Sequence, residues 1–473
     1  MNHQREYPLH QKPFRRALFL LWGLGFAINI SAQTLGTEQN YAMNSPGIVK
    51  VQAVFSATVY VNKVDLNQSR FDKLVDSVKR LDSTGRLFTS EQKLDILVRA
   101  LYKNPLRFFT PTEEYFKQAH RVESSGTGFL ITGDGYILTN CHIIDRDSAY
   151  IRRKFILSTF HEVSEAGINA LQNSWAMELN EQQRNLLNDA YGLIYSQLSS
   201  LILFDLKKEF FVSYRADRGG EDAETVQTTA QIIRQGQPMP GKDVAILKIN
   251  APHELPALQL SRDPFIAIGT QVLVLGYPEP VPSHSFLASA AAIEPSLTTG
   301  IVSAVKTSIH GWPVIQMDAL ISHGSSGSPV CNDHGEVIGI ATFGSIDAGG
   351  TSLASGFNFA IPVSVVRDFL EDAGLDPRPG KSTALYNEGL DLYFHQYYRR
   401  ALEKFRETAL VNVKYPQLSF YTDQCVRKVE SGAGHSAPPR TYVLYFMSLL
   451  GVGAVMMIIY RTRKNRKRIL HAS

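Results

Sequence analysis

The sequence predicts a mainly β body with helical insertions, followed by a small helical segment and a membrane-spanning helix. Three observations carry this prediction. Short runs of β-branched and apolar residues, broken by Gly and Pro, fill residues 126 to 366, as in all-β barrels and sandwiches. Longer stretches without Pro carry apolar residues at helical spacing. Two strongly apolar segments lie near the two ends of the sequence.

The composition excludes several classes of partner. The 473 residues suffice for two or three domains, and 44% hydrophobic with 19% charged residues is ordinary for a globular protein. The net charge of +4 is small and much of it lies in residues 461–468, so we expect no nucleic-acid partner.

Cys141, Cys331 and Cys425 are too few for a disulfide scaffold or a metal site, and we expect free thiols, no metal and no cofactor. A Cys141–Cys331 bridge is the alternative.

The two apolar segments predict targeting and topology. Residues 1–32 combine a basic start, a short apolar stretch and a small residue, Ala32, which is typical of an export signal; an uncleaved anchor is the alternative. Residues 442–460 span about 19 residues without a charge, enough to cross a bilayer as a helix. Because the basic tail 461–473 follows directly, we expect it in the cytoplasm and the body on the extracytoplasmic side.

The elements between these segments follow in order. Residues 47–63 are β-branched and partly alternate, which predicts one or two strands. Residues 69–103 show helical spacing inside an insertion at about 64–120. Residues 160–203 contain no Pro and predict a second helical insertion, a hairpin whose apolar residues lie on more than one face. It would act as a lid near the site or only as a packed decoration.

The C-terminal part of the body is predicted to be helical. A short helix is expected at 364–373, ending at Gly374, and a linker follows. Residues 381–430 predict a helical hairpin, in which Gly389, Ala401 and Phe405 have the spacing of the small, small and aromatic positions of a tetratricopeptide repeat. An ordinary hairpin is the alternative. Residues 431–441 form a flexible linker to the membrane helix.

Three patches carry the residue types of nucleophilic catalysis by serine. They are Leu138-Thr-Asn-Cys-His142, Asp243-Val-Ala-Ile-Leu-Lys-Ile249 and Gly324-Ser-Ser-Gly-Ser-Pro329. A serine hydroxyl needs a base, which histidine supplies, and a buried carboxylate must orient the imidazole. The order His142, Asp243, Ser326 is that of chymotrypsin-type triads, whereas α/β-hydrolases run serine, acid, histidine. Ser328 follows the Ser-Gly pair and is predicted to be a small packing residue.

The three patches together resemble the trypsin-like proteases, specifically the HtrA/Deg type. Further matches are Thr299-Gly-Ile-Val-Ser-Ala304, Gly335-Glu-Val-Ile-Gly-Ile340 and Phe357-Asn-Phe-Ala-Ile-Pro362. The resemblance covers about 126–158 and 205–370. It implies two six-stranded β-barrels within a protease domain at 47–375, with the triad His142, Asp243 and Ser326 between the barrels.

The resemblance also assigns the surroundings of the triad. The N–H groups of Gly324 and Ser326 are the expected oxyanion hole. Leu320, Thr342 and Phe343 are assigned to the substrate pocket, with Leu320 at its base. An apolar side chain there would leave a basic P1 residue unpaired, so we expect an apolar P1 preference.

The expected function is that of a membrane-anchored serine endopeptidase acting on proteins outside the cytoplasm, in quality control or signalling. The family usually carries PDZ domains, but residues 375–440 show no such pattern, and the helical segment stands in their place. The alternative is an inactive protease-fold protein that binds partners through its C-terminal helices. A non-peptidase hydrolase is disfavoured by the triad order. The sequence leaves natural substrates and oligomeric state open.

Overall fold

The computed structural model describes residues 34–83, 89–145, 148–198, 201–217, 223–278, 294–346, 353–435, 447–448 and 450–461. The expected export signal at 1–32 lies outside these residues, as do most of the linker 431–441 and of the basic tail. The expected membrane helix 442–460 lies partly outside them. In the described part of the chain, no helix is both long and apolar enough to cross a bilayer.

The first half of the body is a closed six-stranded barrel. Its strands follow the order β1, β2, β3, β6, β5, β4, and all neighbours are antiparallel. The bounds are β1 Ile48–Leu66, β2 Phe109–Leu130, β3 Tyr136–Thr139, β4 Leu201–Asp217, β5 Ala223–Gln235 and β6 Ala245–Ile249. The β-branched run at 47–63 is therefore one long strand.

The second half is a closed barrel of the same size, in the order β10, β11, β12, β9, β8, β7. Its bounds are β7 Gln271–Gly276, β8 Ser296–Thr307, β9 Pro313–Met317, β10 Pro329–Cys331, β11 Val337–Ile346 and β12 Leu353–Pro362. Helix α9, Val363–Asp372, follows, and the chain leaves it through Gly374 at φ +65°. The two six-stranded barrels that the resemblance implied are confirmed.

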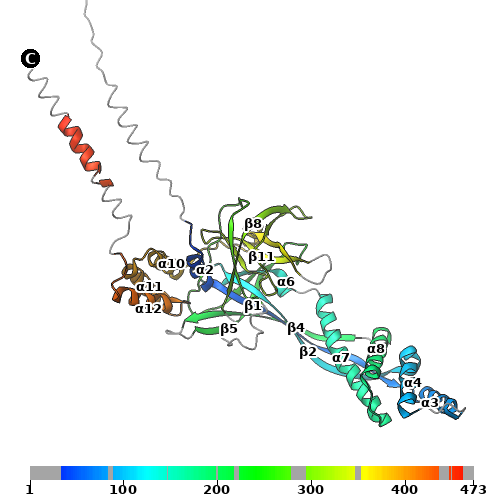
Figure 1. Cartoon of the computed structure of the whole chain (residues 1–473). Coiled ribbons are helices and arrows are strands. Elements are labelled where there is room, and N and C mark those ends of the chain that lie inside the picture. The colour runs from blue at the N-terminus through cyan, green and yellow to red at the C-terminus, as the bar shows by residue number, and fades with distance from the viewer. Residues whose placement is uncertain are drawn as a thin grey trace, which may run out of the picture.

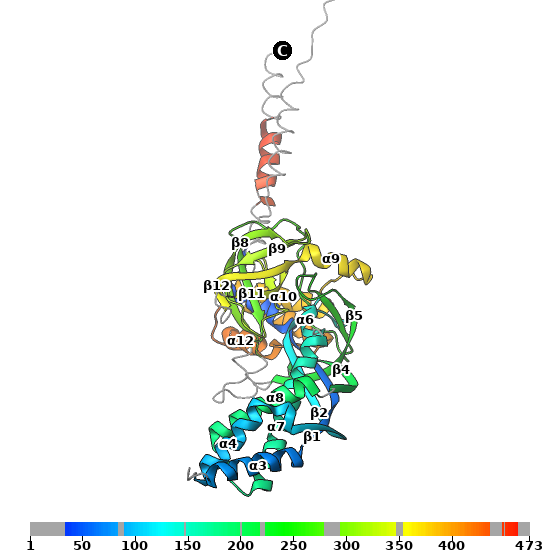
Figure 2. The same ribbon diagram turned by 90° about the vertical axis from the view of Figure 1, so that its right-hand side faces the viewer.

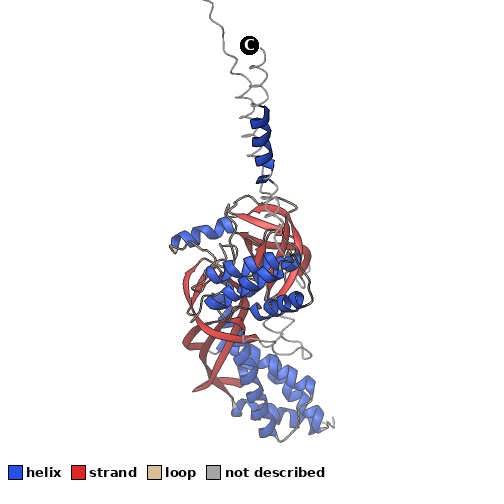
Figure 3. Ribbon diagram, turned by 90° about the vertical axis from the view of Figure 1, so that its left-hand side faces the viewer, coloured by secondary structure: helices blue, strands red, loops and turns tan. Residues whose placement is uncertain are grey.

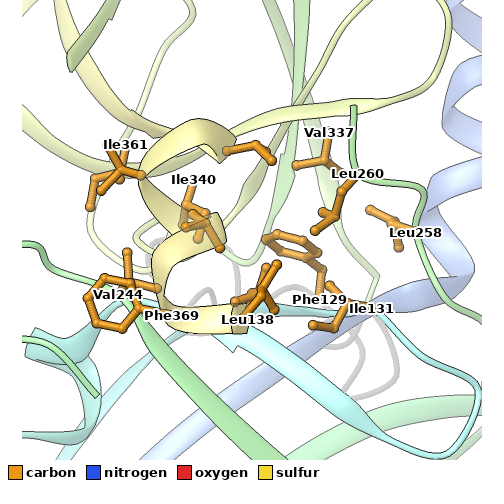
Figure 4. Close-up of a cluster of buried hydrophobic side chains, with 14 of the residues drawn as sticks. Phe129, Ile131, Leu138, Val244, Leu258, Leu260, Val337, Ile340, Ile361 and Phe369 are labelled. Carbon is orange, nitrogen blue, oxygen red and sulfur yellow. The ribbon is translucent and has the colours of Figure 1, made fainter. Parts of the chain in front are cut away.

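The barrels share one apolar core. Phe129, Leu138 and Val244 of the first barrel pack with Ile340 and Ile361 of the second, and Phe369 of α9 closes the same cluster (Figure 4). Leu258 and Leu260, on the connection between the barrels, belong to this cluster too. Burying such a continuous surface fixes the relative position of the two barrels, and with it any site to which both contribute.

Strands β1, β2 and β4 continue beyond the first barrel as a three-stranded extension. Pairing of β1 with β2 runs without interruption from Ile48–Phe129 to Asn62–Tyr115 and resumes, after a bulge, at Val64–Pro111. At the end of this extension lies a helical module that is far from the second barrel in Figures 1 and 2. Its helices are α3 Gln68–Ser83, α4 Ser90–Lys103, α5 Pro105–Phe108, α7 Ser148–Trp175 and α8 Glu181–Leu198.

The helical module corrects the predicted insertions. Helix α7 begins at Ser148, earlier than the predicted residue 160, and residues 109–120 are strand because they pair with β1. The two insertions build one core, in which Phe71 stacks on Trp175 and Leu101 is buried with Leu187. The prediction that residues 160–203 pack against more than solvent is confirmed. Their place at the end of the extension favours the decoration over the lid.

The C-terminal segment holds three helices instead of the predicted hairpin: α10 Lys381–Phe394, α11 Tyr398–Val411 and α12 Leu418–Glu430. Helix α2, Thr37–Asn44, packs on α10, so the two ends of the body lie side by side (Figure 1). Figure 3 shows two groups of helices, one against the strands of the body and one at the far end of the extended strands. Two of the residues with this spacing are in contact, since a Cβ at Gly389 would lie 2.5 Å from the Phe405 ring. A third helix was missed because residues 412–417 carry only one Pro as a break.

These helices are fixed to the first barrel and to the connection that follows it by partly buried polar contacts. The Glu254 carboxylate accepts hydrogen bonds from the Ser382 N–H, at 2.6 Å, and from its hydroxyl, at 2.7 Å, in the first turn of α10. Asp217, at the end of β4, accepts from the N–H and hydroxyl of Ser419 in the first turn of α12, at 2.8 and 2.6 Å. Each carboxylate satisfies otherwise unpaired N–H groups and lies at the positive end of the helix dipole.

Candidate active site

The imidazole of the site lies on a single helical turn after β3. Asn140 has extended backbone angles at the N-cap, and α6, Cys141–Ile144, follows. Apolar neighbours Cys141, Ile143 and Ile144 are buried, which leaves His142 as the partly exposed residue of this turn. The Asn140 amide donates to the Asp243 carbonyl at 2.8 Å, so the turn is tied to the loop between β5 and β6.

Asp243 is fully buried and orients the imidazole. Its Oδ2 lies 2.6 Å from His142 Nδ1, and its Oδ1 accepts from the His142 backbone N–H at 2.8 Å. A third donor, the Thr342 hydroxyl of β11, reaches Oδ2 at 2.7 Å. Burying a carboxylate is costly unless its oxygens are hydrogen bonded, and here both are. The arrangement holds Nδ1 as a donor and leaves Nε2 as the basic nitrogen.

Ser326 lies in a tight loop whose glycines are required by geometry. The Ser325 N–H donates to the Ser322 carbonyl at 3.0 Å, and Gly324 has φ +88° at the third position of this turn. Gly327 has φ +86°, and a Cβ there would overlap the Thr127 carbonyl oxygen. In the described part of the chain, neither the Gly324 N–H nor the Ser326 N–H has a hydrogen-bond acceptor. Two unpaired donors on one loop suit a developing oxyanion.

The Ser326 hydroxyl is not yet engaged with the base. Its Oγ donates to the Thr342 carbonyl at 3.0 Å, and within the described residues no hydrogen bond joins it to His142. Catalytic hydrogen bonds in proteases without substrate are often long or unformed and tighten only in the complex. Of the residues that the sequence singled out, His142 and Asp243 are in contact, and Ser326 is connected to Asp243 through Thr342, whose carbonyl accepts from Ser326 and whose hydroxyl donates to Asp243.

Ser328 occupies the interior position that the sequence predicted. It is fully buried, its hydroxyl has no partner among the described residues, and a Cβ on Gly276 would overlap it. No space for a substrate remains at this hydroxyl.

The pocket residues are only partly where the sequence placed them. Leu320 is 62% exposed, because burial alternates along this stretch and its neighbours Ala319 and Ile321 point inward. Thr342 is 2% exposed, and its hydroxyl supports Asp243 instead of lining a pocket. Phe343 pairs through its backbone with Phe359, and its side chain lies outside the described set. The contacts made by Thr342 and Asn140 were missed, since neither residue type marks a role by itself.

The cysteines are free and buried, so the alternative of a Cys141–Cys331 bridge is wrong. Burial raises the pKa of the Cys141 thiol to about 12, with Asp243 adding to the effect. Burial likewise raises the pKa of Cys331 to about 12. Cys141 therefore remains a neutral thiol beside His142 and offers no competing nucleophile. Among the described residues, no cluster of His, Cys, Asp and Glu side chains could hold a metal ion.

Comparison with known proteins relates the chain to a class first. The family model for the trypsin-like peptidase domain matches residues 126–340, so this part of the chain is similar to such a domain. The relatives are HtrA-type proteases: serine protease HTRA1B of Danio rerio is 33% identical over 147 residues, 30% of this chain and 27% of that protein. A probable periplasmic serine endoprotease DegP-like of Pseudomonas fulva is 27% identical over 251 residues, 52% of this chain and 34% of that protein.

The chain thus spans about a third or less of the length of these curated relatives. A solved HtrA-type protease with a decapeptide aligns with 72% of this chain and 68% of its own, at 19% identity and a TM-score of 0.36. These comparisons relate part of the chain to trypsin-like peptidases and to HtrA-type proteases.

Proposed function

We propose that the protein is a serine endopeptidase with Ser326 as nucleophile, His142 as general base and Asp243 as the orienting acid. The observation that carries the proposal is the His142–Asp243 pair, with three donors on a fully buried carboxylate, beside a serine loop with two unpaired N–H groups. Such an arrangement is suited to generating and stabilising a tetrahedral oxyanion.

The mechanism follows from these positions. When a substrate peptide binds at the loop, the Ser326 hydroxyl turns from the Thr342 carbonyl toward His142 Nε2. His142 takes the hydroxyl proton as Ser326 Oγ attacks the carbonyl carbon of the substrate. The oxyanion accepts from the N–H groups of Gly324 and Ser326. His142 then gives the proton to the leaving amine, which releases the first product and leaves an acyl-enzyme. Water, deprotonated by His142, attacks the ester, and the proton returns to Ser326 as the acid product leaves.

The test uses two neighbouring serines. Ser326→Ala should lower kcat by about 10³-fold or more and abolish labelling by a fluorophosphonate probe. Ser328→Ala should label and cleave normally and fold at least as stably, because it removes a buried hydroxyl without a partner. Loss of activity in Ser328→Ala with retention in Ser326→Ala would refute the assignment.

The proposed substrates are proteins cleaved after apolar residues. Leu320 and Phe357 are both exposed on the second barrel, and the Leu320 carbonyl accepts from the Thr298 hydroxyl of β8 at 3.0 Å. An apolar surface offers a basic P1 side chain no counter-charge. A peptide-library profile should favour Val, Ala or Leu at P1, and a profile dominated by Lys or Arg would contradict the proposal.

The proposed location is the extracytoplasmic face of a membrane, with residues 442–460 as anchor and the basic tail in the cytoplasm. This rests on the sequence pattern alone. A protease-sensitive tag after Ser473 should be protected in intact cells, while residues 126–370 become accessible once any outer barrier is opened. Accessibility of the tag from outside would reverse the orientation.

The second candidate is an inactive protease-fold protein that binds partners through α10–α12, which resemble a tetratricopeptide unit. One observation favours it, namely the Ser326 hydroxyl on the Thr342 carbonyl in place of His142. Fluorophosphonate labelling separates the two, since a serine that cannot reach its base is not phosphonylated. Labelling that depends on Ser326 excludes the inactive protein.

A further inference from the structure

Thr127, on β2 of the first barrel, makes four hydrogen bonds around the serine loop. Its hydroxyl donates to the Gly324 carbonyl at 2.8 Å and accepts from the Tyr277 N–H at 2.9 Å. Its N–H donates to the Ser326 carbonyl at 2.8 Å. Its own carbonyl accepts from the Thr139 hydroxyl at 2.7 Å. The residue is fully buried, so water does not compete for any of these bonds.

The close approach of the two barrels at this point is permitted by a missing side chain. A Cβ on Gly126 would lie 3.0 Å from the Ser326 carbonyl oxygen and would overlap the Ile143 side chain. With glycine at 126, the backbone of the first barrel can reach the serine loop of the second. This short distance lets Thr127 form hydrogen bonds to the carbonyls of Gly324 and Ser326.

The hydroxyl contact bears directly on the orientation of Gly324. Glycine has the least restricted backbone of any residue, so nothing intrinsic keeps Gly324 at φ +88°. A rotation of the His323–Gly324 peptide would turn the Gly324 N–H away from the side of the Ser326 N–H. The Thr127 hydroxyl holds the Gly324 carbonyl, on the following peptide, from the opposite barrel. The contact therefore fixes the Gly324 Cα from which the N–H is directed, and it leaves fewer backbone angles open to Gly324.

We propose that Thr127 is a positioning residue, which holds the Gly324 N–H in place for the oxyanion through the Gly324 carbonyl. The proposal rests on the proposed function, since it gives Thr127 a role in the same reaction. Thr127 does not touch the substrate. Its hydroxyl serves as donor and acceptor at once, which a serine could also do and a valine could not.

The experiment compares three variants of the full chain. Thr127→Val keeps the side-chain shape and the backbone N–H but removes the hydroxyl. Because loss of one oxyanion donor costs about 10²–10³ in kcat, a donor that is only misplaced should cost about 10- to 100-fold, with KM changed less than about threefold. Thr127→Ser should restore most of kcat. Thr139→Val removes a buried hydroxyl that donates to the Thr127 carbonyl and not to the serine loop, and this variant should retain kcat within about threefold.

A second readout separates positioning from a general loss of structure. The affinity of a peptide boronic acid, which forms a tetrahedral adduct on Ser326, should weaken by the same factor as kcat in Thr127→Val. Binding of an uncleaved peptide should be equal in Ser326→Ala and in the double variant Thr127→Val/Ser326→Ala. Circular dichroism and thermal unfolding of each variant give the folded fraction by which activities are corrected.

The outcomes for the two proposals are distinct. If the parent protein neither cleaves peptides nor labels, the proposed function fails and Thr127 is not at issue. If the parent is active but folded Thr127→Val retains its kcat and its boronate affinity, the positioning role is overturned. Equal losses in Thr127→Val and Thr139→Val would overturn it too, since they would point to the network as a whole.

Discussion

Asp243→Asn is the substitution for which the structure gives the most detailed expectation. Both carboxylate oxygens accept hydrogen bonds: Oδ1 from the His142 N–H, and Oδ2 from the Thr342 hydroxyl and His142 Nδ1. An asparagine offers one acceptor and one donor in the same places. If its oxygen replaces Oδ2, the amide nitrogen faces the His142 N–H, and a buried donor without an acceptor costs about 1–3 kcal/mol.

The opposite orientation satisfies every group. The amide oxygen then accepts from the His142 N–H, while the nitrogen donates to His142 Nδ1 and to the Thr342 oxygen, since a hydroxyl can accept as well as donate. Nδ1 must then be unprotonated, which places the proton on Nε2. A base protonated on Nε2 cannot take the Ser326 proton. The preferred conformer of the variant is therefore folded and inactive.

We expect kcat/KM to fall by about 10⁴-fold, equivalent to about 5.5 kcal/mol in the activation barrier, with the unfolding temperature nearly unchanged. The assay is hydrolysis of a peptide with an apolar P1 residue, and ¹⁵N chemical shifts of the His142 ring report the tautomer. Asp145→Asn is the control, because Asp145 lies three residues from His142 but its contacts are exposed: an ion pair with Lys208 and a long hydrogen bond, 3.4 Å, from the Gln235 amide. A folded Asp243→Asn protein that keeps a tenth of its activity would refute the reasoning.

Three further predictions concern the rest of the molecule. Gly389→Ala should destabilise the C-terminal helices by about 1–3 kcal/mol, because the new Cβ meets the Phe405 ring. Thermal unfolding measures this loss. Gly192→Ala is the control, because the atom nearest to its new Cβ is 3.6 Å away. Glu254→Gln should weaken the attachment of α10 by about 0.5–2 kcal/mol, which limited proteolysis would detect as faster cleavage after Gly374. The control Glu403→Gln, at an exposed position, should leave the cleavage rate unchanged. Iodoacetamide at pH 8 should not label the folded protein. Burial raises the pKa of the thiols to about 12, so only about 10⁻⁴ of each thiol is ionised at this pH. Labelling of Cys141 in the native protein would contradict its burial.

The sequence was sufficient to predict those features that depend on residues close together along the chain. The strands and the motifs around His142, Asp243 and Ser326 could be recognised because each combines a residue type with a required backbone form, such as glycine at φ +88° before the serine. The contacts of Thr127, Thr342 and Asn140 could not be recognised. They depend on where two barrels meet, and a threonine that donates across 197 residues of sequence looks the same as one in any strand.

The helical module shows why sequence position alone misplaces an insertion. Helix α7 leaves the first barrel only a few residues after His142, which suggested a lid over the site. Between Ile48 and Leu66, however, β1 keeps its pairing with β2 almost throughout, so the sheet itself carries the module outward. Phe55, Val59 and Val61 of the extension are buried with Ile151 and Phe155 of α7, which fixes the helix to the sheet along this length. To reach Ser326 the module would have to lose that core, so a gating role would require far more than a loop movement.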